Sequence, residues 1–587
     1  MTSPPAPGGL RHLPVVVMAA LLVPLAIVRV RLASSINVNW DELYFLSHVH
    51  SHLRGALSEK LLTFHVHFLA WVARVSSNEI DQVLALREVM LAFGAVAVVS
   101  TVVIGWRLIG SAAGALFAVF AGQSLSLVLN HGASARFDPI IVALFLAAAA
   151  LLSGHSAPRR RARAVVAGVV VAVAMLVSIK SALYLPTLVG LLVCRVISED
   201  NRRDAVVDVF VFLACLVVVG AALFGVHVAS LAVAPAVAAG TVDGGLGGLL
   251  ASVFKTALVD QEFPQPSALM STLRWDGAVW LLALVGFGLA CAGVGARRAQ
   301  LQHMQLLCFI LPLVGIAVYR NSFAYFYVSV VPPAALLAGL VVGRVHTRLL
   351  HRPVLATLLI LLIATPVARA AWRWNWLNSE DQVSSQRDVV DAVHAIFPTP
   401  VPYVDRCAMI ATFPKAGPFM STWTLAAYRK LGTPIMEPLL RQYQPQFVLQ
   451  NVGGLELGRS FEGNAKAHRL LPADFAILQQ NFIPHWGPIW VAGKAVSLPG
   501  NDASVAVDVV IAGRYVLESA APVMVDGAAV APSAVVELVE GAHTLSASRP
   551  LVATLRTASA QPPPTSAAPK DPLFVGFGFR TAPKRPQ

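Results

Sequence analysis

Charged residues are scarce in this chain: only 13% of its 587 residues are Asp, Glu, Lys or Arg. Soluble globular proteins carry about 25%. The deficit therefore excludes a cytosolic enzyme, a disordered chain and a nucleic-acid-binding protein. Hydrophobic residues make up 56% of the sequence, and the mean hydropathy is +0.68. These values are typical of a membrane protein with some soluble mass attached.

Cysteine is scarce as well, with five residues in the whole chain. Four of them lie in apolar runs and the fifth, Cys407, stands alone, so we expect no disulfide framework. The sequence also lacks a Walker loop, a Gly-rich dinucleotide motif and a nucleophile elbow in a suitable context. We therefore expect no required cofactor.

Long apolar runs, in contrast, are frequent. A spanning helix needs about 20 mostly apolar residues, and eleven stretches approach this length. The first of them has no small-residue cleavage site after it, so we interpret it as an uncleaved signal anchor. The sequence thus predicts a polytopic α-helical membrane protein with about 11 spans. The predicted spans are residues 13–30, 88–106, 111–129, 139–153, 164–179, 182–194, 206–229, 277–294, 304–319, 325–343 and 353–370.

The net charge of +13 is concentrated in arginine clusters between these spans. With the N-terminus in the cytoplasm, every cluster falls on the cytoplasmic side, as the positive-inside rule requires. The excess charge then reports topology, and we expect no nucleic-acid partner. The clusters are Arg159–Arg161 with Arg163, then Arg195 with Arg202 and Arg203, then Arg297 with Arg298, and Arg344 with Arg348 and Arg352.

The same orientation places the residues after 371 outside the cytoplasm. Because arginine far outnumbers lysine, as in GC-rich bacterial genomes, we expect a bacterial inner membrane with the C-terminal domains in the periplasm or an equivalent extracytoplasmic space. We predict a membrane module over residues 1–370, with outer loops at 31–87 and 230–276. Alternating helix-like and strand-like segments predict an α/β domain at 371–500, and β-rich segments a small β-sandwich domain at 501–560. Residues 561–587 form a Pro-rich tail that we expect to be disordered or loosely attached.

Two acidic residues, Asp41 and Glu42, lie just beyond the first span. One interpretation is structural: Asn39 or Asp41 caps a helix that starts here, and Glu42 favours its positive end. The other is a carboxylate held at the membrane surface as a general base or a metal ligand. The two interpretations are compatible, since a capped helix end fixes a carboxylate well.

Further charged and polar residues interrupt the outer ends of later spans. The first pair is Arg136 and Asp138, Lys180 follows, and a third short outer loop contains Arg320, Asn321 and Tyr325. Lys180 alone could be a snorkelling lysine. However, three isolated cations on the outer face run against the positive-inside rule, and together they favour an anionic ligand such as a lipid phosphate.

His65 and His67 have an i, i+2 spacing that suits a strand or an irregular loop better than one helix face. They are candidate substrate or metal contacts, but no third metal ligand is evident beside them. With the carboxylates Asp41, Glu42 and Asp138 in the outer loops, a divalent cation such as Mg²⁺ or Mn²⁺ can be accommodated, although the chemistry does not require one.

The order of these motifs resembles a known superfamily. An acidic pair (Asp41, Glu42) is followed by R-x-D (Arg136, Asp138), by a lysine before LYLP (Lys180), and by RN-x-x-x-YF (residues 320–326). Over residues 10–370 the sequence resembles the GT-C glycosyltransferases that use polyprenyl-phosphate-linked sugars. This group includes the protein O-mannosyltransferases and the aminoarabinose transferases of lipid A.

The resemblance implies inverting transfer of a sugar from a polyprenyl-phosphate donor to an acceptor hydroxyl on the outer face. It implies that Asp41 accepts the acceptor's proton and that Glu42 and Asp138 orient the substrates. Arg136, Lys180 and Arg320, with Asn321 and Tyr325, would bind the donor phosphate. One segment departs from the pattern: family members often carry a His-Pro-Pro-like sequence where this chain has FHVHF.

The acceptor is left open as an envelope glycan, a lipid or a protein, and the sugar is open too. The main alternative is a transporter or flippase of the same lipids without transferase activity. A transporter would place charges near mid-membrane in paired broken helices, whereas the unusual charges here lie at the outer ends of the spans.

Overall fold

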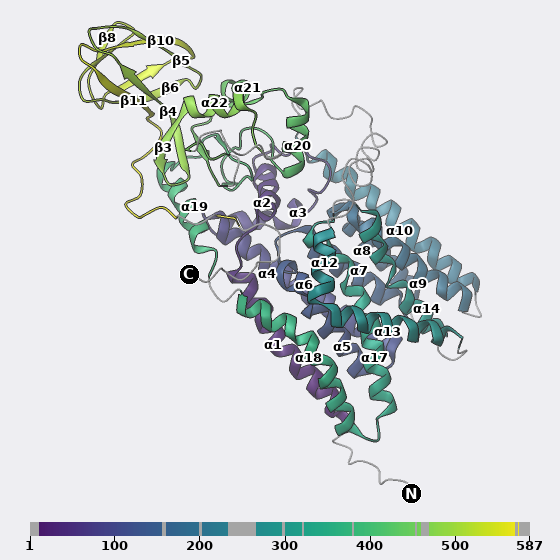
Figure 1. Ribbon diagram of the computed structural model, residues 1–587. Coiled ribbons are helices and arrows are strands. Elements are labelled where there is room, and N and C mark those ends of the chain that lie inside the picture. Colours follow the sequence, from purple (N-terminus) through teal and green to yellow (C-terminus); the bar gives the residue numbers. More distant parts are fainter. Residues whose placement is uncertain are drawn as a thin grey trace.

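The computed structural model describes residues 11–154, 160–198, 202–232, 266–295, 300–319, 322–377, 381–451, 455–458, 469–569 and 573–574. Figure 1 shows an elongated molecule with two parts. The described residues from 11 to 377 form a bundle of helices, called here the helical part. The described residues from 381 to 574 form a smaller unit of strands and helices at one end of the bundle, called here the C-terminal part.

The described residues include eight helical stretches that are long and apolar enough to cross a membrane. They are Leu13–Ser35 (α1), Glu79–Ile109 (α4), Ile179–Ile197 (η3 and α9), Arg202–Ala229 (α10), Gly277–Val294 (α13), Gln300–Val318 (α14, η5 and α15), Ala324–Arg348 (η6, α16, η7 and α17) and Pro353–Arg373 (in α18). All eight coincide with predicted spans.

The other three predicted spans are also helical: α5 (Ala112–Ser124), α7 (Phe137–Leu152) and α8 (Arg160–Val177). The first two are short, and α8 begins with three arginines within four residues. Length and composition therefore identify eight spans, and the number eleven stays a prediction.

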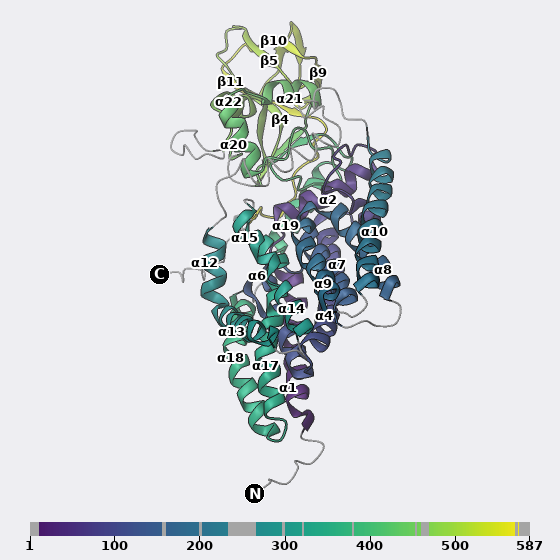
Figure 2. The same ribbon diagram turned by 90° about the vertical axis from the view of Figure 1, so that its right-hand side faces the viewer.

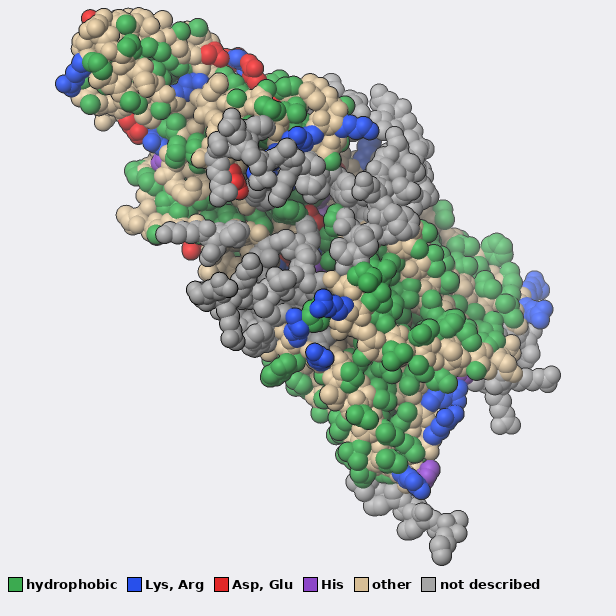
Figure 3. Space-filling model, in the orientation of Figure 1, with side chains coloured by type: hydrophobic (Ala, Val, Ile, Leu, Met, Phe, Trp, Pro, Cys, Tyr) green, Lys and Arg blue, Asp and Glu red, His purple; other side chains and the backbone are tan. Residues whose placement is uncertain are grey.

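Apolar side chains cover the visible face of the helical part, and Lys and Arg lie at its margins (Figure 3). Several large apolar side chains are more than half exposed, among them Phe210 at 68% and Leu362 at 69%. A soluble protein rarely exposes a continuous apolar patch of this kind. The chain is therefore a multi-pass membrane protein.

Shorter helices lie towards the end of the helical part that adjoins the C-terminal part. They are α2 (Trp40–Leu53), α3 (Val66–Leu69), η2 (Ala70–Arg74), α6 (Ser126–His131) and α12 (Pro266–Trp275). In both ribbon views, α2 and α19 (Ser384–Ile396) lie where the two parts meet (Figures 1 and 2).

α4 begins at Glu79, nine residues before the predicted span at 88. The Asn78 side chain accepts a hydrogen bond from Ile80 N, and two acids, Glu79 and Asp81, occupy the first turn. Side-chain capping and acids near the positive end favour a helix start here. The polar first turns of α4 thus project beyond the apolar stretch and become available to the C-terminal part.

One sheet of the C-terminal part has the strand order β1-β2-β4-β11-β6-β9, with β3 also paired to β4. Its strands are β1 (Tyr403–Val404), β2 (Phe447–Leu449), β3 (Phe482–Trp486), β4 (Ile489–Leu498), β6 (Gly513–Glu518), β9 (Val535–Leu538) and β11 (Leu551–Thr557). β1 and β2 are parallel, and β4 is antiparallel to both β2 and β11. Because β4 ends at Leu498 and pairs on both sides, the sheet continues across the domain boundary predicted at residue 500.

A second sheet has the order β5-β10-β7-β8. Its strands are β5 (Val505–Val509), β7 (Val523–Val525), β8 (Ala528–Val530) and β10 (Gly541–Ser546). Apolar residues of β5, β7 and β10 pack with residues of β6 and β11 in one core, for example Val507 with Leu517 and Leu555. Three more helices complete the first half of this part: α20 (Thr422–Leu431), α21 (Met436–Tyr443) and α22 (Pro472–Asn481).

The C-terminal part is hydrogen-bonded to the loop between α1 and α2. The Gln386 side chain of α19 accepts from Val38 N and donates to Val38 O, both at 2.9 Å. The Pro-rich tail also returns to this loop, since Asn37 Nδ2 donates to Leu573 O at 2.9 Å. Trp486 Nε1 donates to Ser566 O at 3.0 Å. The described tail residues are therefore packed against the protein, where the sequence suggested loose attachment.

A second contact between the two parts contains a titratable group. His394 Nε2 lies 3.0 Å from Glu79 Oε2, and Glu79 is fully buried. Burial acts to lower the pKa of His394, but its hydrogen bond and charge interaction with Glu79 outweigh burial and raise it above 6.5. Protonated His394 therefore stabilises the contact between α19 and α4.

Because the folded pKa is raised, this stabilisation is fully present below pH 6.5 and is lost as pH rises through the folded pKa. We expect the thermal midpoint of the wild-type protein to fall, relative to that of His394→Gln, between about pH 6 and pH 8. Parallel pH profiles for the two proteins would contradict the expected role of His394.

Candidate active site

The first candidate residues are held by the N-terminus of α2. Asn39 Oδ1 accepts from Asp41 N at 2.9 Å, and Glu42 Oε2 accepts from Asn39 N at 2.8 Å. This reciprocal pair is a capping box, so the structural interpretation of the motif is correct for Asn39 and Glu42. The capped turn leaves Asp41 projecting at the helix start with its side chain 20% exposed.

Glu42 is completely buried and makes a two-pronged ion pair with Arg87 of α4. The Arg87 Nη2–Glu42 Oε2 distance is 2.6 Å, and the Nε–Oε1 distance is 2.8 Å. Glu42 Oε1 also accepts from Ala135 N at 2.7 Å. Burial acts to raise the pKa of Glu42, but the Arg87 charge and these hydrogen bonds outweigh it and hold the pKa below its ordinary value.

The bond to Ala135 connects α2 to the loop before α7, which carries the next candidates. Arg136 makes an ion pair with Asp41, and its Nε lies 3.4 Å from Asp138 Oδ2. Asp138 Oδ1 in turn lies 3.0 Å from Lys180 Nζ. Residues nearly 140 positions apart in sequence thus form one chain of alternating charges.

Aromatic rings cover one side of this chain of charges. The Arg136 guanidinium carbon lies 3.7 Å from the centroid of the Tyr325 ring, and Lys180 Nζ lies 4.9 Å from the same centroid. Phe137 contacts the same two cations at 5.5 and 5.1 Å. Rings at these distances attract cations and exclude water from the charges.

We call Asp41, Arg136, Asp138, Lys180 and Tyr325 the charged cluster. Arg136, Asp138, Lys180 and Tyr325 are each less than 10% exposed, whereas Asp41 is the most open member. The two carboxylates balance the two cations, so these five residues carry no net charge. Arg320 and Asn321, predicted to bind a phosphate, lie outside the described residues.

The loop that carries Arg136 depends on a glycine. A Cβ at Gly132 would lie 2.3 Å from Val128 O, so only glycine permits the chain to turn after α6. Pro139 occupies the first turn of α7, where its missing N–H costs no helix bond. These two residues place Arg136 and Asp138 beside α2.

The two histidines of the FHVHF segment lie apart from the charged cluster's hydrogen bonds and point to different neighbours. His65 is fully buried, stacks on Phe45 at 3.6 Å and lies 3.0 Å from Phe45 O through Nε2. Burial lowers the pKa of His65 well below its ordinary value. His67 Nε2 lies 2.8 Å from His227 Nδ1.

Across the described ranges, no group of three or more His, Cys, Asp or Glu side chains is arranged to hold a metal ion. The sequence analysis missed Arg87, although its position just before the apolar stretch at 88 marks it as a charge at a span boundary. It also missed His227, for which no local sequence signal exists because its partner lies 160 residues away.

Solved structures share this architecture. The oligosaccharyltransferase of Archaeoglobus fulgidus in the apo form superposes with a TM-score of 0.52 and 12% identity, covering 88% of this chain and 74% of that chain. The aminoarabinose transferase ArnT of Cupriavidus metallidurans, bound to undecaprenyl phosphate, has a TM-score of 0.51 and 14% identity, covering 81% of this chain and 97% of that one. Both are GT-C glycosyltransferases.

The chain has the GT-C fold.

No protein-family model matches the sequence, and no curated protein matches it either. At 12% and 14% identity the likeness establishes the GT-C fold alone. The charged cluster lies at the end of the GT-C helical bundle that meets the C-terminal part. What the cluster can do chemically depends on its own geometry: the Asp41 carboxylate is partly open to solvent, and its ion pair with the buried Arg136 holds it in place.

Proposed function

We propose that this chain is an integral-membrane glycosyltransferase. It moves a sugar from a polyprenyl-phosphate donor to an acceptor hydroxyl, with inversion at the anomeric carbon. The observation that carries the proposal is Asp41: the most open carboxylate of the charged cluster, held by a capped helix and paired with Arg136, in a GT-C fold. The complex of the structurally similar ArnT with undecaprenyl phosphate supports a donor of this class.

In the proposed reaction, the oxygen of the acceptor hydroxyl attacks the anomeric carbon from the face opposite the phosphate. Asp41 accepts the proton of that hydroxyl. The new carbon–oxygen bond forms while the bond from that carbon to the phosphate oxygen breaks. The electron pair leaves with the lipid phosphate. A phosphodiester becomes a phosphomonoester, so negative charge develops on the departing group and must be stabilised.

Arg136 supplies part of that stabilisation through its pairing with Asp41. Before transfer, the Arg136 charge is balanced by the Asp41 and Asp138 carboxylates. When Asp41 becomes protonated, it no longer neutralises Arg136, and the guanidinium is available to the leaving phosphate. Proton uptake and phosphate stabilisation are thereby coupled through one ion pair. Lys180 and Arg320, with Asn321 and Tyr325, remain the other predicted phosphate contacts.

The other members of the site position these groups. Glu42 fixes both the start of α2 and the loop before Arg136 through its bonds to Asn39, Arg87 and Ala135. Asp138 and Lys180 hold each other at 3.0 Å inside the bundle. Because side chains carry the charge in this scheme, a divalent cation is not required.

The test is transfer by the purified protein in nanodiscs, with radiolabelled polyprenyl-phosphate sugars as donors and envelope glycans, lipids or proteins as acceptors. Label should move to one acceptor class in wild-type protein. Vesicles that show lipid flipping but no label transfer with any donor would instead establish the transporter.

The Tyr325 ring gives a more specific expectation for transfer. Tyr325→Phe keeps the aromatic face over Arg136, so kcat/KM should stay within about threefold of wild type. Tyr325→Leu removes that face and should lower kcat/KM by about tenfold, since a buried cation–π contact is worth about 1–2 kcal/mol. The initial rate of label transfer measures both. A leucine variant as active as wild type would exclude a role for the ring.

A further inference from the structure

A cation that the charged cluster does not use lies within the first spanning helix. Arg29 is six residues before the end of α1, with its side chain turned towards the bundle, where Gly94 of α4 lies in contact range. A charged side chain inside a membrane span is costly and normally has a partner of opposite charge or a ligand.

The neighbours of Arg29 are neutral. Nη1 donates to Gln123 Oε1 at the end of α5, and Nη2 donates to Gly132 O at 3.2 Å. Among the residues that the structure describes, no Asp or Glu forms an ion pair with this guanidinium. A structural brace between α1 and α5 would need only these hydrogen bonds, so the positive charge itself is unexplained.

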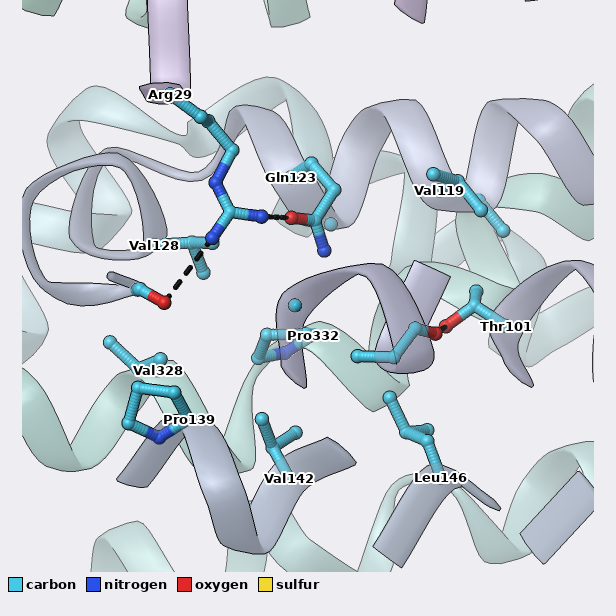
Figure 4. Close-up of a pocket in the computed structure, with 15 residues that line it drawn as sticks. Arg29, Thr101, Val119, Gln123, Val128, Pro139, Val142, Leu146, Val328 and Pro332 are labelled. Carbon is cyan, nitrogen blue, oxygen red and sulfur yellow. Dashed lines mark hydrogen bonds between the residues drawn. The ribbon is translucent and has the colours of Figure 1, made fainter. Parts of the chain in front are cut away.

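Arg29 and Gln123 face the same cavity, which lies between α1, α4, α5, α6, α7 and α16 (Figure 4). The cavity volume is about 30 Å³. A single water needs about 10–15 Å³, whereas a cavity that holds a benzene ring measures about 150 Å³. The space therefore suits a small ion or the tip of a headgroup and excludes a sugar ring.

The polar wall of this cavity presents hydrogen-bond donors. Since a guanidinium can only donate, Gln123 must turn Oε1 to Arg29 and its amide N–H₂ into the cavity, as Figure 4 shows. That amide nitrogen makes no hydrogen bond to any described residue. The Thr101 hydroxyl proton is already donated to Ala97 O at 2.8 Å, so this oxygen can only accept a hydrogen bond. The donors are therefore Arg29 and the Gln123 amide, and together they favour a ligand that accepts hydrogen bonds and carries negative charge.

The remaining walls are apolar or small. Val142 and Leu146 of α7 and Gly122 of α5 line the cavity, and Gly94 and Gly132 leave space around the guanidinium. A Cβ at Gly132 would lie 3.1 Å from Arg29 Nη2 and would push the guanidinium away from its present position. Beside these apolar walls, a charge-assisted bond from arginine to an oxyanion is favoured.

We propose that Arg29 and Gln123 form a binding site for a small phosphate-class oxyanion, separate from the charged cluster. None of the five cluster residues lines the cavity. The oxyanion is either the phosphate of a membrane lipid or free inorganic phosphate, and the same donors recognise both. The proposal does not depend on glycosyl transfer.

The test is equilibrium binding to the full chain, purified in a neutral detergent without phosphate. The probes are radiolabelled inorganic phosphate and dodecyl phosphate, compared across wild type, Arg29→Gln, Arg29→Lys and Arg31→Gln. Arg31 is the matched control, because it lies two residues further along α1 and donates to Asn375 O instead. Arg29→Gln should bind one anion fewer per chain, and Arg29→Lys should retain it with weaker affinity.

Binding of dodecyl phosphate alone would identify a lipid headgroup, and binding of both probes would identify a site open to the free ion. Unchanged stoichiometry in Arg29→Gln, equal loss in Arg31→Gln, or no binding of either probe would overturn the proposal. Gln123→Leu keeps the charge and removes the amide donor. It should weaken binding several-fold if the amide faces the anion, and unchanged affinity would remove Gln123 from the site.

Discussion

Replacing Asp41 with Asn should reduce kcat for sugar transfer by about 10³-fold while leaving expression, membrane insertion and the thermal midpoint close to wild type. A positioned general base contributes about 10²–10⁴ to a rate, and Asn cannot accept the proton of the acceptor hydroxyl. Asn can still accept a hydrogen bond from Arg136, so the charged cluster should keep its arrangement. Single-turnover transfer with a labelled donor measures the loss.

Asp388→Asn is the matched control, since Asp388 is an exposed carboxylate of α19 near the same end of the molecule. That variant should transfer sugar at the wild-type rate. The base assignment fails if Asp41→Asn keeps more than about a tenth of the wild-type kcat.

The second large effect concerns stability. Removing one partner of a buried ion pair costs about 3–5 kcal/mol, because the other charge stays buried without compensation. Arg87→Met should therefore lower the free energy of unfolding by about this amount. It also removes the Arg87 hydrogen bonds to the carbonyl oxygens of Ala33, Ile36 and Asn37. Glu42→Gln should be milder, since its oxygen can still accept from Ala135 N.

The measurement is the thermal unfolding midpoint in detergent, followed by tryptophan fluorescence. Arg387→Met is the control, because the Arg387–Asp81 pair involves the same helix, α4, but its side chains are 36% and 40% exposed. Exposed pairs contribute about 0–1 kcal/mol. Equal losses for Arg87→Met and Arg387→Met would show that the buried pair has no special role in holding α2.

The apolar stretches of the sequence indicated where helices lie, and helices occur at all eleven of them. The reason is local: long apolar runs must satisfy their backbone hydrogen bonds internally in lipid, which a helix does. The start of α4 was missed, because Asn78 and the acids after it extend the helix beyond the apolar run. Polar turns of this kind are fixed by capping and tertiary contacts, which hydropathy does not measure.

In the candidate site, too, the sequence indicates which residues are unusual, and the tertiary contacts decide their surroundings. The sequence singled out Asp41, Glu42, Arg136, Asp138, Lys180 and Tyr325 as unusual, and the structure brings these six residues together. The structure also gives the two adjacent acids different surroundings: Glu42 is buried against Arg87, while Asp41 remains partly open. Two adjacent acids cannot be distinguished in this way by sequence, because the difference arises from residues 45 and 95 positions away.

The scarcity of charge and the arginine clusters by themselves determined a multi-pass membrane protein and a small set of costly polar residues near the ends of its spans. Only the tertiary structure decided that four of these charges form a neutral, mutually paired cluster, that the histidines of FHVHF contact other partners, and that Arg29 lacks a described carboxylate partner. The physical reason is that the cost of a buried charge depends on what lies within a few ångströms of it. Folding sets those neighbours across long separations in sequence.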